Sequence, residues 1–335
     1  MQKKHGLLLI NLGTPSDITP TAIKNYLTEF LLDRHVVDLP YFIWYTILKY
    51  IVLPKRVPYI INHYRKIWLN GASPLLHFSQ LLRDKLSYTL PYVRCELAMT
   101  YGEPNMQSAL ENLKSCDELI ILPLFPQYST TTTLAVFDKL KPLISTYPIL
   151  AHAQFIRDYA SHPSYIHALY LQIKQSFLEH GQPEVLLLSY HGIPERYISK
   201  RQDDYIERCE LTTKLLVEKC QANGINLPIH MAYQSKFGKG KWVEPNTSDV
   251  LQKLANNGKK TIQVMCPGFS ADCIETIYEI DEQNRAIFLN AGGENFFYIP
   301  ALNDSDIHIN LLLELINYTE TYSVQETSLQ HCNLR

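Results

Sequence analysis

The sequence predicts an α/β protein with two similar domains, each built on a parallel sheet flanked by helices. Three observations predict this fold class. The chain has 335 residues, roughly twice the ~150 residues of one typical domain. Short apolar runs recur along it, and stretches of amphipathic helical length separate those runs. Strands and helices that alternate in this way are typical of parallel sheets.

Seven short apolar runs are predicted to be buried strands. Most of them are almost continuously apolar, which indicates strands that are covered on both faces. The runs are residues 6–11, 93–99, 118–124, 149–155, 184–190, 229–233 and 261–266. They fall into two sets of about four strands, one set for each domain.

The stretches between these runs are predicted to be helices. They are residues 20–32, 74–89, 106–115, 134–146, 162–180, 203–223 and 246–257, with a last helix at 305–318. Thr19 as N-cap and Pro20 in the first helical position mark the start of the first helix. We expect domains at 1–160 and 161–304, a helix 305–318 that can pack back on the first domain, and a polar tail at 319–335.

Composition excludes several classes of protein. Hydrophobic residues make up 46% of the chain, so a large core is available and extensive disorder is excluded. The formal net charge is −2, so there is no basic excess for nucleic-acid binding. Seven cysteines without a C-x-x-C pair suggest neither a disulfide framework nor a zinc site. The N-terminus lacks a signal-peptide pattern, and we therefore expect a cytosolic protein.

The segment 41–53, YFIWYTILKYIVL, is the most membrane-like part of the sequence. It is interrupted by Lys49 and is shorter than the ~20 residues that a spanning helix needs. Two interpretations stay open, namely an amphipathic segment at a membrane surface or over a ligand, and a helix that faces the core.

The predicted carboxyl ends of the strands are where a ligand would bind in a parallel sheet. No G-x-G-x-x-G follows the first strand at Gly13, which argues against a nicotinamide enzyme. His191 and Gly192 follow the strand 184–190. An imidazole exposed there could transfer protons near neutral pH or bind a metal, although a hydrogen-bonded structural histidine is the simpler alternative.

Four acidic residues follow the strand 261–266. On a helix, Asp272, Glu275, Glu279 and Glu282 would form one stripe. A column of carboxylates can pass on a divalent cation or protons. The alternative is a capping box from Asp272 to Glu275 followed by a solvated face.

Eight segments in this order together resemble the ferrochelatase family. They are LINLGTP at 9–15, FLLDR at 30–34, GASP at 71–74, LPLFPQYS at 122–129, SYHGIP at 189–194, YQSKFG at 233–238, PGFSADCIET at 267–276 and YIPALN at 298–303. The resemblance runs from about residue 7 to 315. It implies two Rossmann-like, chelatase-type domains, each with a four-stranded parallel sheet, and an active cleft between them. The implied activity is insertion of Fe²⁺ into protoporphyrin IX, the terminal step of haem biosynthesis.

The resemblance also implies roles for individual residues. His191 matches the family's active-site histidine and Glu275 its acidic partner, so the pair would serve catalysis and hold the metal. The acidic relay would continue through Asp272, Glu279 and Glu282. The apolar lip 41–56 includes Lys55 and Arg56, at positions for the porphyrin propionates. The further expected porphyrin-binding residues are Leu12, Ser73, Phe125, Tyr128, Trp242 and Phe269.

Two departures from the family pattern bear on metals. Cys273 stands where many members have a second histidine, so His191 and Glu275 would act without a third side chain. The only cysteine of the tail is Cys332, and Thr130 occupies the position that supplies an internal cysteine in animal members. We therefore expect no [2Fe–2S] cluster and no other cofactor, since Fe²⁺ is a substrate.

The expected partners are protoporphyrin IX and Fe²⁺. We expect a cytoplasmic protein with peripheral contact to the inner face of the membrane through 41–53; a monomer is favoured, but the oligomeric state stays open. A chelatase for coproporphyrin or cobalt is the nearest alternative. A non-catalytic haem or porphyrin carrier is the alternative of a different class, and multiple turnover would separate it from an enzyme.

Overall fold

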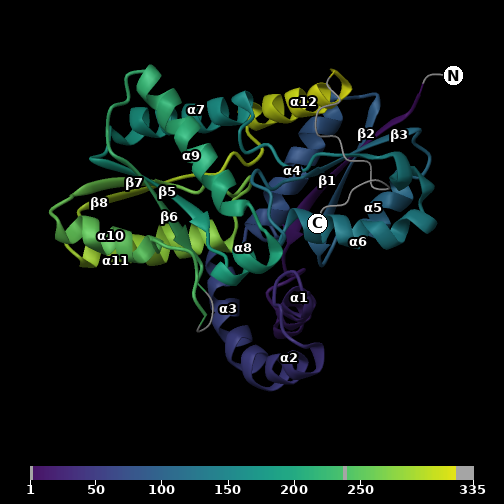
Figure 1. The fold of residues 1–335 in the computed structure, drawn as a ribbon, viewed down its shortest axis with the longest axis horizontal. Coiled ribbons are helices and arrows are strands. Elements are labelled where there is room, and N and C mark those ends of the chain that lie inside the picture. The colour runs from purple at the N-terminus through teal and green to yellow at the C-terminus, as the bar shows by residue number, and fades with distance from the viewer. Residues whose placement is uncertain (1–2, 237–239, 322–335) are drawn as a thin grey trace. The chain divides into compact units, whose positions relative to one another are not determined.

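The computed structural model describes residues 3–236 and 240–321 (Figure 1). The chain divides into two compact units. The first contains the residues up to Phe125, Ser129–Asp158 and the chain from Leu312, and the second contains Pro126–Tyr128 and Tyr159–Leu311. Each unit has its own four-stranded parallel sheet with helices on it, which confirms the predicted fold class.

The sheet of the first unit has the order β2-β1-β3-β4. Its strands are β1 (His5–Gly13), β2 (Val93–Tyr101), β3 (Glu118–Pro123) and the two-residue β4 (Gln154–Phe155). All its pairs are parallel. Leu7, Leu8, Leu9 and Ile10 of β1 are fully buried, because helices cover both faces of this central strand.

Side-chain N-caps at Thr19, Ser73 and Asn105 mark the start of three helices of the first unit. The helices of this unit are α1 (Pro20–Leu32), α2 (Tyr41–Ile47), α3 (Leu53–Ile67), α4 (Pro74–Thr89), α5 (Met106–Leu113) and α6 (Thr133–Leu140), with the π-helical turn η1 (Leu48–Val52) between α2 and α3. Two 3₁₀ turns follow α6, η2 (Lys141–Ser145) and η3 (Pro148–His152). The Thr19 side chain accepts a hydrogen bond from the Ala22 amide, as predicted for an N-cap.

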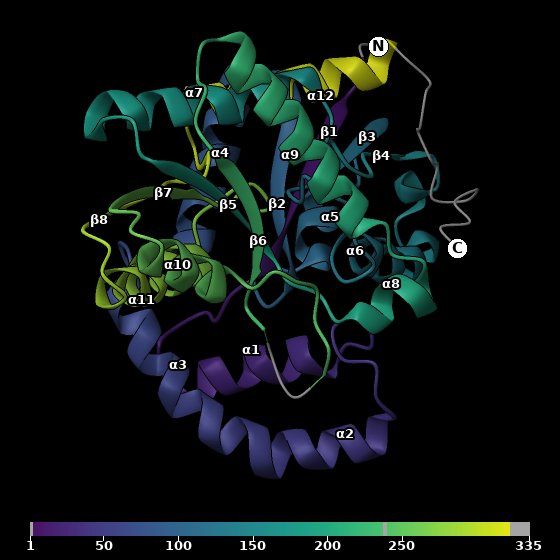
Figure 2. The ribbon, with the colours of Figure 1, turned by 60° about the vertical axis from the view of Figure 1, so that its left-hand side comes forward.

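The segment 41–53 lies on α1 with an inner and an outer face (Figure 2). Trp44 and Leu48 are buried, and the Trp44 indole N–H donates to the carbonyl oxygen of Leu31 at the end of α1 (2.6 Å). Phe42 and Ile51 point outward and are exposed. One face of the segment therefore packs on the unit, and the other is solvent-exposed.

The sheet of the second unit repeats the strand order of the first, as β6-β5-β7-β8. Its strands are β5 (Val185–His191), β6 (Ile229–Gln234), β7 (Thr261–Met265) and β8 (Asn295–Ile299), all parallel. The strand order reverses next to β5. The carboxyl ends of β5 and β7 therefore flank the crevice in which such sheets bind ligands.

Helices lie on both faces of this second sheet. They are α7 (Pro163–His180), α8 (Glu195–Arg201), α9 (Tyr205–Ala222), α10 (Thr247–Asn256), the π-helix η4 (Ile274–Asn284) and α11 (Arg285–Asn290). Figure 1 shows α7 and α9 on one face and α10 and α11 on the other. The last helix is α12 (Asp306–Thr321), so the predicted tail from residue 322 lies outside the described residues.

Two strand predictions differ from the structure. Residues 149–155 were expected to be a strand, but the 3₁₀ turn η3 takes up most of them and leaves only the edge strand β4. Pro148 at the start of η3 favours this turn. The strand β8 was missed, since Asn295–Ile299 is a short run after Gly292 and Gly293 without a distinctive pattern.

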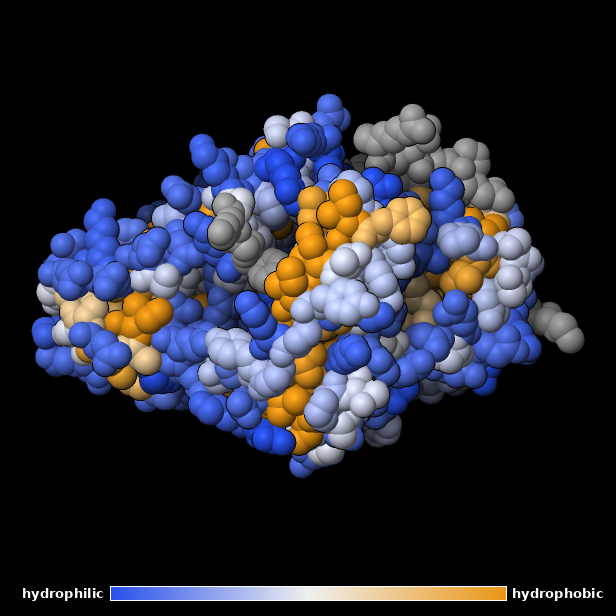
Figure 3. Space-filling view, turned by 90° about the horizontal axis from the view of Figure 1, so that it is seen from below, coloured by the Kyte–Doolittle hydropathy of each residue, from blue (hydrophilic) through white to orange (hydrophobic). Residues whose placement is uncertain are grey.

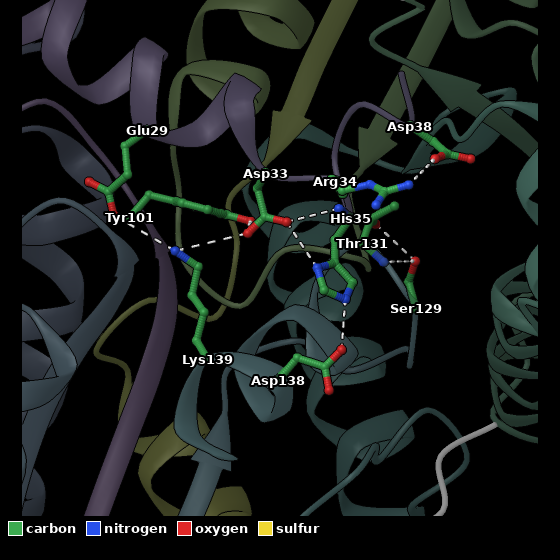
Figure 4. Close-up of polar contacts among 10 residues, drawn as sticks. All are labelled: Glu29, Asp33, Arg34, His35, Asp38, Tyr101, Ser129, Thr131, Asp138 and Lys139. Atoms are coloured by element: carbon green, nitrogen blue, oxygen red, sulfur yellow. Dashed lines mark hydrogen bonds and ion pairs between the residues drawn. The ribbon is translucent and has the colours of Figure 1, made fainter. Parts of the chain in front are cut away.

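A group of charged side chains fixes the loop between α1 and α2 (Figure 4). His35 lies between two carboxylates, with Nδ1 2.9 Å from Asp33 Oδ1 and Nε2 3.0 Å from Asp138 Oδ2. The Tyr101 hydroxyl donates to Asp33 (3.0 Å), and Lys139 lies 3.9 Å from the same carboxylate. An imidazolium can donate from both nitrogens at once, so the charged form of His35 fits this place.

The same contacts shift the pKa values of both partners. Burial lowers the pKa of His35, but the hydrogen bond and charge of Asp33, together with Asp138, outweigh this effect, and the pKa is raised. Burial raises the pKa of Asp33, but the hydrogen bonds and charge of His35 outweigh it and lower that pKa to about 2. The loop is therefore held by a charged pair at neutral and mildly acidic pH.

We predict that this group makes stability depend on pH. The contribution of His35 to the free energy of unfolding is complete below its unfolded-state pKa of about 6.5. It is lost as the pH rises through the higher pKa of His35 in the folded state. The contribution of Asp33 to the free energy of unfolding is present above about pH 3.9 and is lost as the pH falls towards the folded-state pKa of Asp33. His35→Gln should lower the free energy of unfolding by about 1–3 kcal/mol near pH 5.5 and by less near pH 8.5. Urea titrations at both pH values measure the difference, and an equal loss at both would contradict the prediction.

Candidate active site

His191 lies at the carboxyl end of the central strand β5. It is the first half-buried residue after six buried ones, and in the sheet it pairs with Gln234 of β6. Gly192 follows it, and its amide donates to the carbonyl oxygen of Gln234 (2.8 Å). A Cβ at position 192 would lie 2.8 Å from that same oxygen, so only glycine lets the two backbones approach this closely.

The orientation of the His191 ring follows from one hydrogen bond. Nδ1 lies 2.7 Å from the carbonyl oxygen of Gly192. Since a carbonyl can only accept, Nδ1 carries the proton, and in the neutral ring the lone pair is on Nε2. Aromatic rings lie beside it, because the Phe269 ring centre is 6.3 Å away and a Trp242 ring atom is 3.4 Å from the Cβ position of Gly192. Nε2 can therefore accept a proton or bind a metal ion.

One carboxylate of η4, Glu279, interacts electrostatically with His191, and a second, Glu275, interacts with Glu279. Glu275 is in the first turn of this helix, and Glu279 is four residues later. Ser235, which follows β6, holds Glu279 with its backbone amide (2.7 Å) and its hydroxyl. Its backbone is in the left-handed region at φ 65°, a conformation that costs energy for a residue other than glycine.

Burial dominates the charge state of Glu279. It raises the pKa of this carboxyl, and the negative charge of Glu275 raises it further. The hydrogen bonds from Ser235 and positive charge on His191 act in the opposite direction. Glu279, Glu275 and His191 therefore form one interacting group in which a positive charge is favoured beside the carboxylates.

The structure departs from the single stripe that an α-helix would form from Asp272 to Glu282. The helix is π-helical, and its wider turn keeps residues four apart near one face but separates residues seven apart, such as Glu275 and Glu282. Asp272 precedes the helix and is buried. Its carboxylate accepts hydrogen bonds from the Thr276 and Tyr298 hydroxyls, the Asn303 side-chain amide and the Ala301 backbone amide. It is an anchor for the segment before η4.

Cys273 caps the helix. Its side chain accepts from the Thr276 amide, and the Thr276 hydroxyl accepts from the Cys273 amide, so the capping box is here and does not run from Asp272 to Glu275. Burial raises the pKa of the Cys273 thiol well above its usual value. A neutral thiol is a poor metal ligand.

The structure places the expected porphyrin-binding residues in both units. Tyr128, Trp242 and Phe269 belong to the second unit, together with His191 and η4. Leu12, Lys55, Arg56, Ser73 and Phe125 belong to the first. Phe125 packs in the core of its unit, and Ser73 is buried as the N-cap of α4, with its side chain accepting from the Leu76 amide. Lys55 is exposed on α3.

Sequence reasoning assigned no role to Gln234 or Ser235. The structure shows their contacts: the Gln234 side chain bonds to the backbone of Glu275, and Ser235 bonds to the carboxylate of Glu279. A signal was present, because these polar residues come directly after the apolar run 229–233 and so lie at a carboxyl end of the predicted sheet.

Comparison of the fold with known structures defines the class of protein. The chain resembles SirB from Bacillus subtilis, solved with Fe³⁺, with a TM-score of 0.57 at 12% sequence identity over 95% of this chain and 98% of that one. The two four-stranded parallel sheets are thus those of a chelatase-type α/β fold.

The sequence comparisons identify the family. The family model for ferrochelatase matches residues 4–320. The ferrochelatase of Pectobacterium atrosepticum is 48% identical over 324 residues, which cover 95% of this chain and 99% of that protein. The ferrochelatase of Yersinia enterocolitica is 47% identical over 320 residues, or 94% and 98% of the two chains. The chain belongs to the ferrochelatase family, whose members are enzymes that insert iron into protoporphyrin in haem synthesis.

We predict that Asp272 contributes to stability and not to metal handling. Asp272→Ala removes the acceptor of several buried hydrogen bonds and should lower the free energy of unfolding by about 3 kcal/mol or more. The KM for Fe²⁺ of the folded fraction should stay at the wild-type value. Urea unfolding and steady-state kinetics measure the two effects, with Glu218→Ala on the exposed face of α9 as control. A raised KM for Fe²⁺ with unchanged stability would contradict the prediction.

Proposed function

We propose that this chain inserts Fe²⁺ into protoporphyrin IX to give protohaem, with His191 and Glu275 as its central residues. The observation that carries the proposal is the His191 ring, whose Nδ1–H is bonded to the Gly192 carbonyl and which interacts electrostatically with Glu279, the carboxyl that in turn interacts with Glu275. The reaction consumes one ferrous ion and releases the two pyrrole protons of the porphyrin. It needs a base, a path for cations and a weak place for iron.

The proposed base is Nε2 of His191. It has one lone pair, so it accepts a pyrrole proton and contacts iron at different times. The negative charge of Glu279 and a positive charge on His191 attract each other. Phe269 and Trp242 beside the ring provide flat apolar surface of the kind that a macrocycle can stack on.

The proposed path for iron or for departing protons runs along Glu275 and Glu279. A hard divalent cation prefers oxygen ligands and water, and a closed four-ligand cage would retain the ion. Among residues 3–236 and 240–321, no three His, Cys, Asp or Glu side chains are grouped so as to hold a metal ion. The proposal requires only one imidazole and one carboxylate with water, which suits a metal that is a substrate.

We also propose that the enzyme works without an iron–sulfur cluster. Cluster ligands are thiolates. Burial raises the pKa of each of the six cysteines in the described part of the chain, to about 11 for Cys95 and Cys220. Neutral, mostly buried thiols support this reading; Cys332 lies outside the described residues.

We propose that the outer face of 41–53 binds the membrane surface. Phe42 is 85% exposed and Tyr50 67%, and an exposed apolar band crosses the face that Figure 3 shows. No Asp or Glu occurs between Asp38 and Asp84, whereas Lys49 and Lys55 are exposed. Apolar side chains among basic ones favour anionic lipid. None of the helices in the described ranges is long and apolar enough to cross a membrane.

His191→Ala is expected to lower kcat for iron insertion by about 100-fold or more, because a positioned general base contributes at least that factor. The measurement is a multiple-turnover assay with Fe²⁺ and protoporphyrin under anaerobic, reducing conditions, followed by absorbance. His230→Ala is the matched control, since this histidine is exposed on the neighbouring strand β6. A normal rate in folded His191→Ala would reject the role of His191.

The double variant Phe42→Ser/Ile51→Ser is expected to weaken binding to vesicles of anionic phospholipid by about tenfold or more, since each buried side chain contributes roughly 1.5–3 kcal/mol. Co-sedimentation measures the binding at two salt concentrations. Tyr88→Ser/Tyr92→Ser is the control, because these aromatic residues are also exposed but lie elsewhere in the first unit. Wild-type protein that stays in the supernatant, or equal binding by both double variants, would reject the membrane proposal.

A further inference from the structure

Gln234 is a buried residue that contacts both parts of the candidate site. Its backbone carbonyl accepts from the amide of Gly192, the residue after His191 (2.8 Å). Its side-chain Nε2 donates to the backbone carbonyl of Glu275 in the first turn of η4 (2.7 Å). One residue at the end of β6 thus connects the strand that carries His191 with the helix that carries the carboxylates.

The orientation of the Gln234 amide is fixed by its neighbours. The Glu275 carbonyl can only accept, so Nε2 must face it and Oε1 must point the other way. Oε1 accepts from the Ser189 hydroxyl (2.7 Å) and from the Cys266 thiol (3.4 Å). Ser189 is two residues before His191 on the same strand, and the Thr247 hydroxyl lies 2.7 Å from its oxygen. The amide has no second orientation that satisfies the same groups.

We propose that Gln234 is a positioning residue, which holds the first turn of η4 and so keeps Glu275 at a fixed place relative to His191. Ser189 takes part by orienting the Gln234 amide. The inference rests on the proposed roles of His191 and Glu275. The bond is made at the backbone of Glu275 itself, so it fixes the start of η4 directly at the residue that carries the carboxylate.

The same sheet contains a matched control for Gln234. Gln263 of β7 is equally buried, and its Oε1 accepts from the Ser176 hydroxyl (2.7 Å) while its Nε2 donates to the Gly181 carbonyl (2.9 Å). The two glutamines therefore make the same kinds of bonds, but those of Gln263 go to α7 and the residue after it, away from His191 and η4.

The test compares Gln234→Met and Ser189→Ala with Gln263→Met and Ser176→Ala. We expect Gln234→Met to lower kcat/KM for Fe²⁺ by about 10–100-fold, the usual effect of losing a partner that orients a metal-binding group. Ser189→Ala should act in the same direction with a smaller effect. Gln263→Met and Ser176→Ala should leave kcat/KM unchanged, although all four variants lower the melting temperature. Calorimetric titration with Co²⁺ alone should show weaker binding for Gln234→Met and, to a smaller extent, for Ser189→Ala, but not for the two control variants. KM for protoporphyrin should not change.

Equal kinetic effects of Gln234→Met and Gln263→Met, after correction for folded protein, would overturn the inference. If Gln234→Met does not fold, Ser189→Ala with wild-type kcat/KM and Co²⁺ affinity overturns it. Glu275→Gln is measured alongside. Wild-type kcat/KM in Glu275→Gln rejects the proposed function of Glu275, whereas a loss there with normal Gln234→Met rejects the positioning role alone.

Discussion

The candidate site depends on the parallel pairing of β5 with β6 on one side and with β7 on the other. This pairing brings the carboxyl ends of three strands together, so that residues 191–192, 234–235 and 266–275 become neighbours. The close approach of Gly192 to the Gln234 carbonyl is part of the same constraint. A shift of one residue in the register would turn His191 to the opposite face of the sheet.

The π-helical form of η4 affects which of its acidic side chains lie near one another. It keeps Glu275 and Glu279 near one face, and it begins at a buried segment that Asp272 anchors. Asp272 and the two glutamates are the same kind of group with different surroundings. The oxygens of Asp272 are bonded to protein donors, whereas Glu279 has Ser235 on one side and the charges of His191 and Glu275 close by. Surroundings rather than residue type therefore distinguish these carboxylates from one another.

The first unit combines an exposed apolar face with a firmly packed inner one. Trp44 and Leu48 hold α2 and η1 on α1, and the charged group of Asp33, His35 and Asp138 fixes the loop that leads into α2. The outward side chains can therefore stay exposed without loosening the segment. An apolar surface kept in place in this manner is typical of a surface for contact with another molecule or a membrane.

The sequence alone determined the central strands, the cap of α1 and the place of His191, because apolar runs, start signals and strand ends are local patterns. It did not determine the form of η4, the anchoring of Asp272 or the edge strands. The bonds that decide these features join residues far apart in the chain, such as Gln234 with Glu275, Ser235 with Glu279 and Asp272 with Asn303. A polar side chain shows in the sequence only that it can form hydrogen bonds. Which partner it meets is decided by the packing of the sheet and its helices, since that packing selects the few groups that come within hydrogen-bond distance.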